Sequence, residues 1–521
     1  MNQAAVAWWQ PNGAAGVQRP PRAFAGTAQA QLAALDGSNA AFYALVAFTF
    51  VLLLSPQAWF PVLKLIRIAF LAGGIAMAAH VMERTAHKQP ITPLAPEIGI
   101  ALSLIFWSVI TIPMSYWPGG SLHLLTDQYL KAIAFFWLLA TIITTPERVR
   151  ALFWSLTLCA IPLAATGIWH YLSGDVMKTT QDGLVRVVGY QGSSGLTGNP
   201  NDLALMLNLI IPLTGALALS SRGMKRLFAV GVTLLSMAGV VITFSRAGFL
   251  ALAATFVMFL LVLVRRKSGG AAMALLVVAL AVPFALPHTY VERLSTITNL
   301  EQDKTGSAQG RYKDLGIALE VVSHNPVVGV GLGQDMIALN QARGLATWRS
   351  VHNVYLQYAV DLGLPGFALF AWLHLLCFRS AWAVERRARK EPAAASLEPL
   401  AAGIQVSLIA FLVAAMFHPI AYQFYFFSIA GLAVALKNTC RATIARARLE
   451  ADLEADLKVR PYTGTQVNAI AATQVNAIAA TQVNAFAATQ ANAVVDTQAN
   501  AVADVRTNAV AADLQVRPGQ L

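Results

Sequence analysis

The sequence has little charge and almost no cysteine. Of its 521 residues only 12% are Asp, Glu, Lys or Arg, whereas 57% are hydrophobic. Soluble domains carry about a quarter charged residues, so this composition excludes an ordinary soluble protein and favours a polytopic membrane protein in a lipid bilayer. The cysteines Cys159, Cys377 and Cys440 lie far apart in the chain. This spacing excludes a disulfide framework and a cysteine-based zinc site.

Motifs for metal, phosphate-loop and hydrolase chemistry are also absent. There is no HExxH, no GxSxG and no cluster of carboxylates, and no Lys-Ser/Thr pair follows the turn GVGLG at 329–333. We therefore expect no metal and no cofactor. The net charge of +12 comes from short basic clusters between apolar runs, a distribution that favours membrane topology signals over a nucleic-acid partner.

Apolar runs of spanning length predict an all-α, polytopic transmembrane bundle of about 12 helices. The first run is short and a re-entrant hairpin at Pro56 is an alternative, so the count carries an error of one or two. An even count places both termini on the same side of the membrane. The runs lie at 40–54, 59–82, 98–116, 128–145, 151–172, 203–220, 227–243, 247–264, 271–287, 363–383, 400–417 and 420–436.

The distribution of Lys and Arg supports a cytoplasmic N-terminus. The short turns that would then lie outside, at 55–58, 117–127 and 418–419, contain neither Lys nor Arg. Basic residues occur in every loop that would lie inside. These are Arg84, Lys88, Arg148, Arg150, Arg222, Lys225, Arg226, Arg265, Arg266, Lys267, the cluster from Arg379 to Lys390, and Lys437 onward.

This topology divides the chain into three parts. Residues 1–39 form a cytoplasmic N-terminal tail, residues 40–440 the transmembrane domain, and residues 441–521 a cytoplasmic C-terminal tail. The C-terminal tail carries octad repeats at 465–504, which we interpret as low-complexity, disordered sequence. The longest hydrophilic insertion, at about 288–362, falls outside and contains a predicted amphipathic helix at 311–324. An outside insertion of this size is where function usually concentrates.

Arg246 is the most informative single residue, because it lies in a tight connection, TFSRAG, between two apolar runs. A cation at the hydrocarbon boundary is unfavourable by several kcal/mol unless it is paired or faces water. One interpretation is an interfacial Arg that extends to solvent. The other is a clamp for an anionic group such as a diphosphate, whose oxygens the planar guanidinium can bind in two places.

The outside loops contain further basic candidates. Arg311 begins the predicted loop helix, where an ordinary pairing with Asp314 or Glu320 is the simpler interpretation. Together with its neighbours it makes the loops basic, which suits a phosphate-bearing partner. The weaker candidates are Lys313, Arg343 and Arg349 in the long loop and Arg186 in the smaller outside loop at 173–202.

His352 is the candidate for proton transfer. It stands where the long loop returns to the membrane, beside Asn353, and imidazole has the pKa for acid-base chemistry. A structural, hydrogen-bonding His is the alternative. His418 precedes Pro419 at another outside turn and is interpreted as a helix-end residue. In LTGNPNDL at 196–203, Asn201 or Asp202 is the expected helix cap.

Four sequence blocks resemble the O-antigen ligase and polymerase superfamily. The segment HNVYLQYAVDLGLPG fits the family pattern His-[Asn/Ser/Gln]-x9-Gly-x-x-Gly through His352, Asn353, Gly363 and Gly366. TFSRAG, GNPNDLA at 198–204 and GRYKDLGIALEVVSHNPVVGVGLG at 310–333 are similar to the family's other blocks, in the same order. The resemblance covers about residues 40–440.

The resemblance implies a bundle-type membrane glycosyltransferase in the bacterial inner membrane, metal-independent and inverting. Such proteins transfer a glycan from undecaprenyl diphosphate to a periplasmic acceptor, which is lipid A-core or a protein hydroxyl. Carried over by position, Arg246 and Arg311 bind the diphosphate, and His352 is the base or orienting group for the acceptor. The chain is also similar to the O-glycosylation ligases associated with exosortase systems. A polymerase of lipid-linked repeat units and a transporter of lipid-linked or anionic glycans are the alternatives.

Overall fold

The computed structural model describes residues 38–58, 60, 62–174, 176–178, 185–187, 190, 197, 199–285, 307–344 and 348–459. The chain forms two compact units, of which the first ends at Arg448. The octad repeats, almost all of the N-terminal tail and residues 286–306 of the long loop lie outside the described residues. The C-terminal boundary expected at 440 falls inside a helix that continues to Val459.

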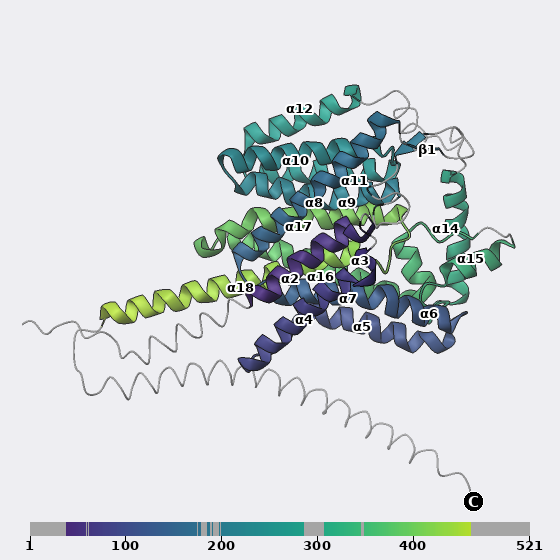
Figure 1. Cartoon of the computed structure of the whole chain (residues 1–521), viewed down its shortest axis with the longest axis horizontal. Coiled ribbons are helices and arrows are strands. Elements are labelled where there is room, and N and C mark those ends of the chain that lie inside the picture. The colour runs from purple at the N-terminus through teal and green to yellow at the C-terminus, as the bar shows by residue number, and fades with distance from the viewer. Residues whose placement is uncertain are drawn as a thin grey trace, which may run out of the picture. The chain divides into compact units, whose positions relative to one another are not determined.

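Helices occupy every apolar run that the sequence predicts (Figure 1). They are α2 (Asn39–Leu54), α3 (Val62–Leu65), α4 (Ile68–Ala86), α5 (Pro96–Thr111), α6 (Pro118–Leu124), α7 (Leu130–Ile142), α8 (Pro146–Ser173), α9 (Pro200–Ser220), α10 (Gly223–Ile242), α11 (Arg246–Arg265), α12 (Gly269–Ala285), α14 (Ser307–His324), α15 (Asp335–Arg343), α16 (Val354–Ala388), α17 (Glu398–Ala414) and α18 (Phe424–Val459). One short antiparallel pair, β1 (Val176–Lys178) with β2 (Val185–Val187), accompanies them.

Among the residues that the structure describes, seven helical segments are long and apolar enough to cross a membrane. The chain is therefore a helical membrane protein, while the count of about twelve spans stays a prediction. Several remaining apolar segments are short or interrupted: α3 and α4 are separated at Arg67, and a π-helical turn at Leu125–Tyr129 separates α6 from α7. The seven segments are Pro96–Met114, Pro146–Ser173, Pro200–Ser220, Gly223–Ile242, Arg246–Arg265, Val354–Ala388 and Pro392–Phe417.

Local sequence signals explain where the helices begin. α8 starts with Thr145 as the cap and Pro146 in the first turn, and α9 starts with Asn199 and Pro200 in the same way. Proline suits this position because the first helical N–H groups have no partner within the helix. The expectation that Asn201 or Asp202 caps α9 was wrong, because the side chain of Asn199 accepts the hydrogen bond from the Asn201 N–H, at 2.9 Å.

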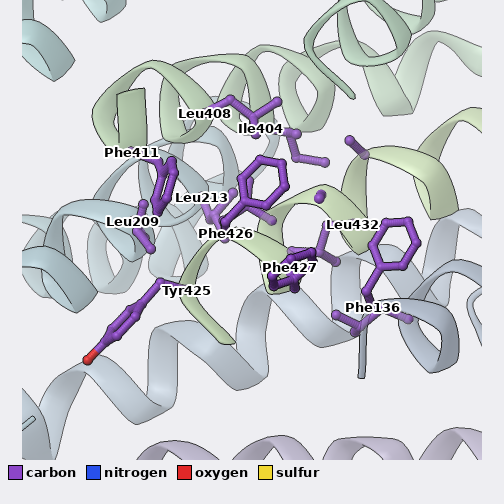
Figure 2. Packing of buried hydrophobic residues seen from close by; sticks show 14 of the residues in the cluster. Phe136, Leu209, Leu213, Ile404, Leu408, Phe411, Tyr425, Phe426, Phe427 and Leu432 are labelled. Atoms are coloured by element: carbon purple, nitrogen blue, oxygen red, sulfur yellow. The ribbon is translucent and has the colours of Figure 1, made fainter. Parts of the chain in front are cut away.

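The core lies where α9, α17 and α18 meet α7 and α8. Aromatic side chains of α18 fill its centre: Phe426 lies 5.3 Å from Phe411 of α17 and 5.3 Å from Phe427, ring centroid to ring centroid. Figure 2 shows Phe411 and Leu209 on one side of Phe426 and Phe136 beyond Phe427. Because lipid tails are as apolar as these side chains, close packing rather than water exclusion holds such helices together.

Buried charges also join the helices. Lys437 of α18 pairs with Glu97 of α5, which also accepts from Ser380 of α16; all three side chains are buried. A second group of ion pairs connects the C-terminal ends of α11 and α16 to the start of α17. In that group Arg266 pairs with Glu398, and Arg389 pairs with Glu385 and Glu398.

α16 is broken at Gly363, which has φ +68° and ψ −175°. The break releases backbone carbonyls that a continuous helix would satisfy. Those of Val360 and Asp361 accept from the N–H groups of Val330 and Gly331, each at 2.9 Å, and that of Leu362 accepts from the Trp107 indole at 2.8 Å. The glycine-rich turn at 329–333 is thus confirmed, and it forms the backbone partner of the break.

We expect Gly363→Ala to destabilise the protein, because a Cβ at this position would lie 2.2 Å from the Val327 carbonyl oxygen. The backbone conformation alone adds about 1–3 kcal/mol of strain for a residue other than glycine. Thermal unfolding of the full chain in detergent micelles measures the effect. Gly316→Ala in α14 is the matched control, since no heavy atom of the described residues lies within 4 Å of a Cβ there. Equal unfolding temperatures for the two variants would contradict the prediction.

Candidate functional site

Four helix ends meet at one end of the bundle. The Ser245 hydroxyl at the start of α11 donates to the Asn201 side chain at the start of α9, at 2.8 Å. The ring of His418, which follows α17, lies 3.2 Å from the Asn201 carbonyl oxygen. The Tyr355 hydroxyl at the start of α16 donates to the Leu412 carbonyl of α17, at 2.8 Å. The expected functional blocks of the sequence thus lie side by side, and the ion pairs of Glu398 lie at the opposite ends of α11 and α17.

α14 and α15 lie together at one end of the bundle (Figure 1). The helix predicted at 311–324 is confirmed as α14, whose buried face includes Asp314, Ala318 and Val321. These residues are spaced three or four apart, as one face of a helix requires. Their burial fixes which side of α14 is turned inward, and it leaves Arg311 half-buried and Lys313 exposed.

His352 lies at the centre of this region. Its Nδ1 is 3.0 Å from the Ser350 carbonyl oxygen. A carbonyl only accepts, so Nδ1 carries the proton in the neutral ring and Nε2 keeps its lone pair. Burial lowers the pKa of His352 to about 4, and the positive charge of Arg311 acts in the same direction. At neutral pH the ring is therefore an uncharged base.

The positive charge of Arg311 lowers the pKa values of two histidines, His352 and His418. Burial is the main cause that lowers the pKa of His418, and Arg311 adds to the effect, although the Ala414 and Asn201 carbonyls oppose it. The charge of Arg311 therefore lies near both His352 and His418. His418 was interpreted from the sequence only as a helix-end residue, because Pro419 follows it. Its contact with Asn201 makes it a part of the candidate site.

Arg246 lies in the same region, because its neighbour Ser245 is hydrogen-bonded to Asn201. It is the first residue of α11 and is half-buried. Ser245, the cap of that helix, accepts from the Gly248 N–H at 3.2 Å and donates to Asn201. A cation at a helix N-terminus gains nothing from the helix dipole, which favours an anion there. This position therefore suits a residue that meets a negatively charged group.

The weaker candidates differ in their burial and in the partners that they already have. Arg343 is buried against Asp314, with Nη2 at 2.7 Å from Oδ1, so its charge is already paired. Arg349 is half-exposed and lies 3.7 Å from the other oxygen of Asp314. Asn353 caps α16 by accepting from the Tyr355 and Leu356 N–H groups. Lys313 is exposed, and the side chain of Arg186 lies outside the described residues.

A buried carboxylate pair that the sequence did not indicate holds the His352 segment in place. Asp361 of α16 accepts from the Asp335 N–H at 2.8 Å and from the Tyr422 hydroxyl at 2.9 Å. Asp335 in turn accepts from the Val351 N–H at 2.8 Å. The available signal was Asp361 itself, a charged residue two positions before the apolar run at 363–383, since charged residues at membrane depth are retained for a specific partner.

Among the described residues, no three His, Cys, Asp or Glu side chains gather as metal ligands. The polar groups that do gather are guanidinium and imidazole groups. Guanidinium binds anions through charge-assisted hydrogen bonds, and neutral imidazole accepts a proton. The arrangement can therefore hold an anion and remove a proton close to it.

Comparison with known proteins gives one family. Residues 231–371 match the family model described as O-antigen ligase, and no curated protein matches the chain. The match runs from α10 to the first half of α16, so it includes Arg246, Arg311 and His352. The resemblance to the O-antigen ligase and polymerase superfamily is confirmed for this part of the chain, which contributes most of the candidate site.

We expect His352 to contribute stability that is lost as the pH is lowered from 6.5 towards 4. The pKa of His352 is about 4 in the folded protein against an ordinary 6.5, so at this residue the unfolded state binds more protons throughout this window, and its contribution to stability rises with pH. His352→Gln removes this contribution, so the stability difference between wild type and variant should change with pH across this window. Unfolding temperatures measured in micelles between pH 4.5 and 7.5 test this.

The matched control for the pH experiment is His324→Gln, at the exposed end of α14. This variant should keep the pH dependence of the wild type. Parallel curves for wild type and His352→Gln would show that His352 is not held in its neutral form by the fold.

Proposed function

We propose that the chain, whose residues 231–371 match the O-antigen ligase family, is a glycosyltransferase that uses a glycan linked to undecaprenyl diphosphate. In this proposal the glycan passes to a hydroxyl of lipid A-core or of a protein, on the periplasmic side of the inner membrane. The observation that carries the proposal is the position of Arg311 beside a neutral His352, within the matched segment.

The diphosphate of the donor is the anion that this site would hold. A diphosphate leaves readily once its developing charge is neutralised, and guanidinium groups can supply that neutralisation without a metal. Arg311 is half-buried close to His352, and Arg246 begins α11 at the same end of the bundle. Arg343 is excluded from this role, because Asp314 already pairs with it in a buried position.

The reaction is a single displacement at the anomeric carbon. The acceptor oxygen forms a bond to that carbon while the bond from carbon to the diphosphate oxygen breaks, which inverts the configuration. The electron pair of the broken bond leaves on the diphosphate, beside the arginines. The proton of the acceptor hydroxyl passes to Nε2 of His352, whose Nδ1 proton is held by the Ser350 carbonyl.

We expect His352→Ala to lower the rate of transfer by about 10²–10⁴-fold, the usual contribution of a general base. Arg246→Ala and Arg311→Ala should each lower it by about 10²–10³-fold, as for other groups that stabilise a developing negative charge. The assay follows transfer from the purified undecaprenyl-diphosphate-linked glycan in the presence of EDTA. Exposed residues supply the controls, His324→Ala and Arg226→Ala, which should retain wild-type rates. Full activity of His352→Ala would remove its assigned role.

The length of the glycans that remain on the carrier lipid distinguishes a ligase from a polymerase. If the chain is a ligase, its deletion in the source cell should leave full-length glycans on the carrier lipid. Deletion of a polymerase would instead leave single repeat units on that lipid. Gel analysis of the lipid-linked pool before and after deletion separates the two outcomes. An unchanged pool would favour the transporter alternative or another acceptor.

A further inference from the structure

A pocket of about 460 Å³ opens beside the His352 segment. This volume lies within the range of small-molecule sites, about 300–1,000 Å³. Its walls come from α6, the start of α15, the segment before His352 and the turn after α17. The lining residues that matter most are Trp117, Gln334, Asp335, Trp348, Ser350 and Tyr422.

The pocket lies against the candidate site through a shared segment. Trp348 and Ser350 line the pocket, and the Ser350 carbonyl holds Nδ1 of His352. Asp335, another lining residue, accepts from the Val351 N–H. A group bound in the pocket is therefore positioned by the same backbone that positions His352.

The chemistry of the lining differs from that of the arginine region. Among the described residues that line the pocket there is no Lys or Arg, so the pocket lacks what a diphosphate needs. It offers instead two indole rings, Trp117 and Trp348, each 60% exposed, and the side-chain amides of Gln128, Gln334 and Gln423. Flat aromatic faces pack on the C–H face of a pyranose ring, and amides bind its hydroxyl groups.

Gln334 gives the most specific indication of which ligand the pocket binds. Its side chain is 3% exposed, and its Nε2 donates to the Leu332 carbonyl at 3.2 Å. Its Oε1 is buried with no hydrogen-bond partner among the described residues. A buried acceptor without a donor is unfavourable, and in a binding site it is satisfied by a donor of the ligand. A sugar hydroxyl supplies such a donor without bringing a charge.

We propose that this pocket binds one neutral pyranose ring of a glycan that takes part in the transfer, with Gln334 accepting from a ring hydroxyl and Trp117 and Trp348 packing on the ring. The inference rests on the proposed function and adds a sugar subsite to it. The ring belongs either to the donor glycan or to a glycan acceptor, and kinetics separate these two sources.

The test uses the full chain in micelles, with lipid-linked glycan extracted from cells that lack the chain and with acceptor from the same cells. We expect Trp348→Ala and Gln334→Met each to raise the KM of one substrate about tenfold or more, with a smaller change in kcat. A higher KM for the donor assigns the ring to the donor, and a higher KM for the acceptor assigns it to the acceptor. Inhibition by glycan-free undecaprenyl diphosphate should be unchanged, because the pocket does not hold the diphosphate.

Trp372→Ala removes a similarly exposed indole on α16 that does not line the pocket, and it should leave both KM values at the wild-type level. Unchanged KM values for both substrates in Trp348→Ala and Gln334→Met would overturn the proposal. If the wild type transfers nothing, the proposed function fails instead. The pocket is then tested by displacement binding, in which the wild type should prefer the extracted lipid-linked glycan over undecaprenyl diphosphate and both pocket variants should lose that preference. Equal affinities in the wild type would overturn it.

Discussion

A helix that breaks within a membrane protein must satisfy its released backbone groups inside the protein, because the hydrocarbon offers no hydrogen bonds. In α16 this requirement is met at Gly363 by the turn at 329–333 and by the Trp107 indole. The turn joins α14 to α15, so the hydrogen bonds at the break in α16 also fix the positions of α14 and α15. Gly329 takes a positive φ there, and a Cβ on it would lie 2.4 Å from the Asp361 carbonyl oxygen. Gly363 of the family pattern therefore joins α16 to this turn, and the chemistry is proposed for the histidine of the same pattern.

Charge is distributed differently at the two ends of α11 and α17. At one end, Arg266 and Arg389 are paired with Glu398, which balances part of the charge of the basic loops that the sequence assigns to the cytoplasm. At the other end, the half-buried Arg311 lowers the pKa values of two neighbouring histidines. Such an arrangement keeps His352 neutral close to a cation, as the proposed base beside a bound anion requires.

Local signals in the sequence were sufficient to predict the apolar helices, because apolar runs act over a few residues, but they did not predict α6 and α15. They predicted α14 and the glycine turn, and the spacing of the family pattern identified His352. They could not predict the buried ion pair of Asp314 with Arg343. Arg343 lies 29 positions from Asp314 in the sequence and meets it only through the packing of α14 against α15. The pairing of Asp335 with Asp361 is likewise invisible in the sequence, since it depends on the break in α16.

Several helices begin near the candidate site, and the positive partial charges at their N-terminal ends give a physical reason for its position. α9, α11 and α16 all begin near Asn201, Ser245 and His352, so their N-terminal partial charges add to those of the arginines. The capping side chains of Asn199, Ser245 and Asn353 satisfy single N–H groups but do not cancel the dipoles. A diphosphate bound there would meet a field set by fixed backbone as well as by flexible side chains, and fixed dipoles need no rearrangement as charge develops on the leaving group. A neutral sugar gains nothing from such a field, which is consistent with a separate pocket whose described lining contains no Lys or Arg.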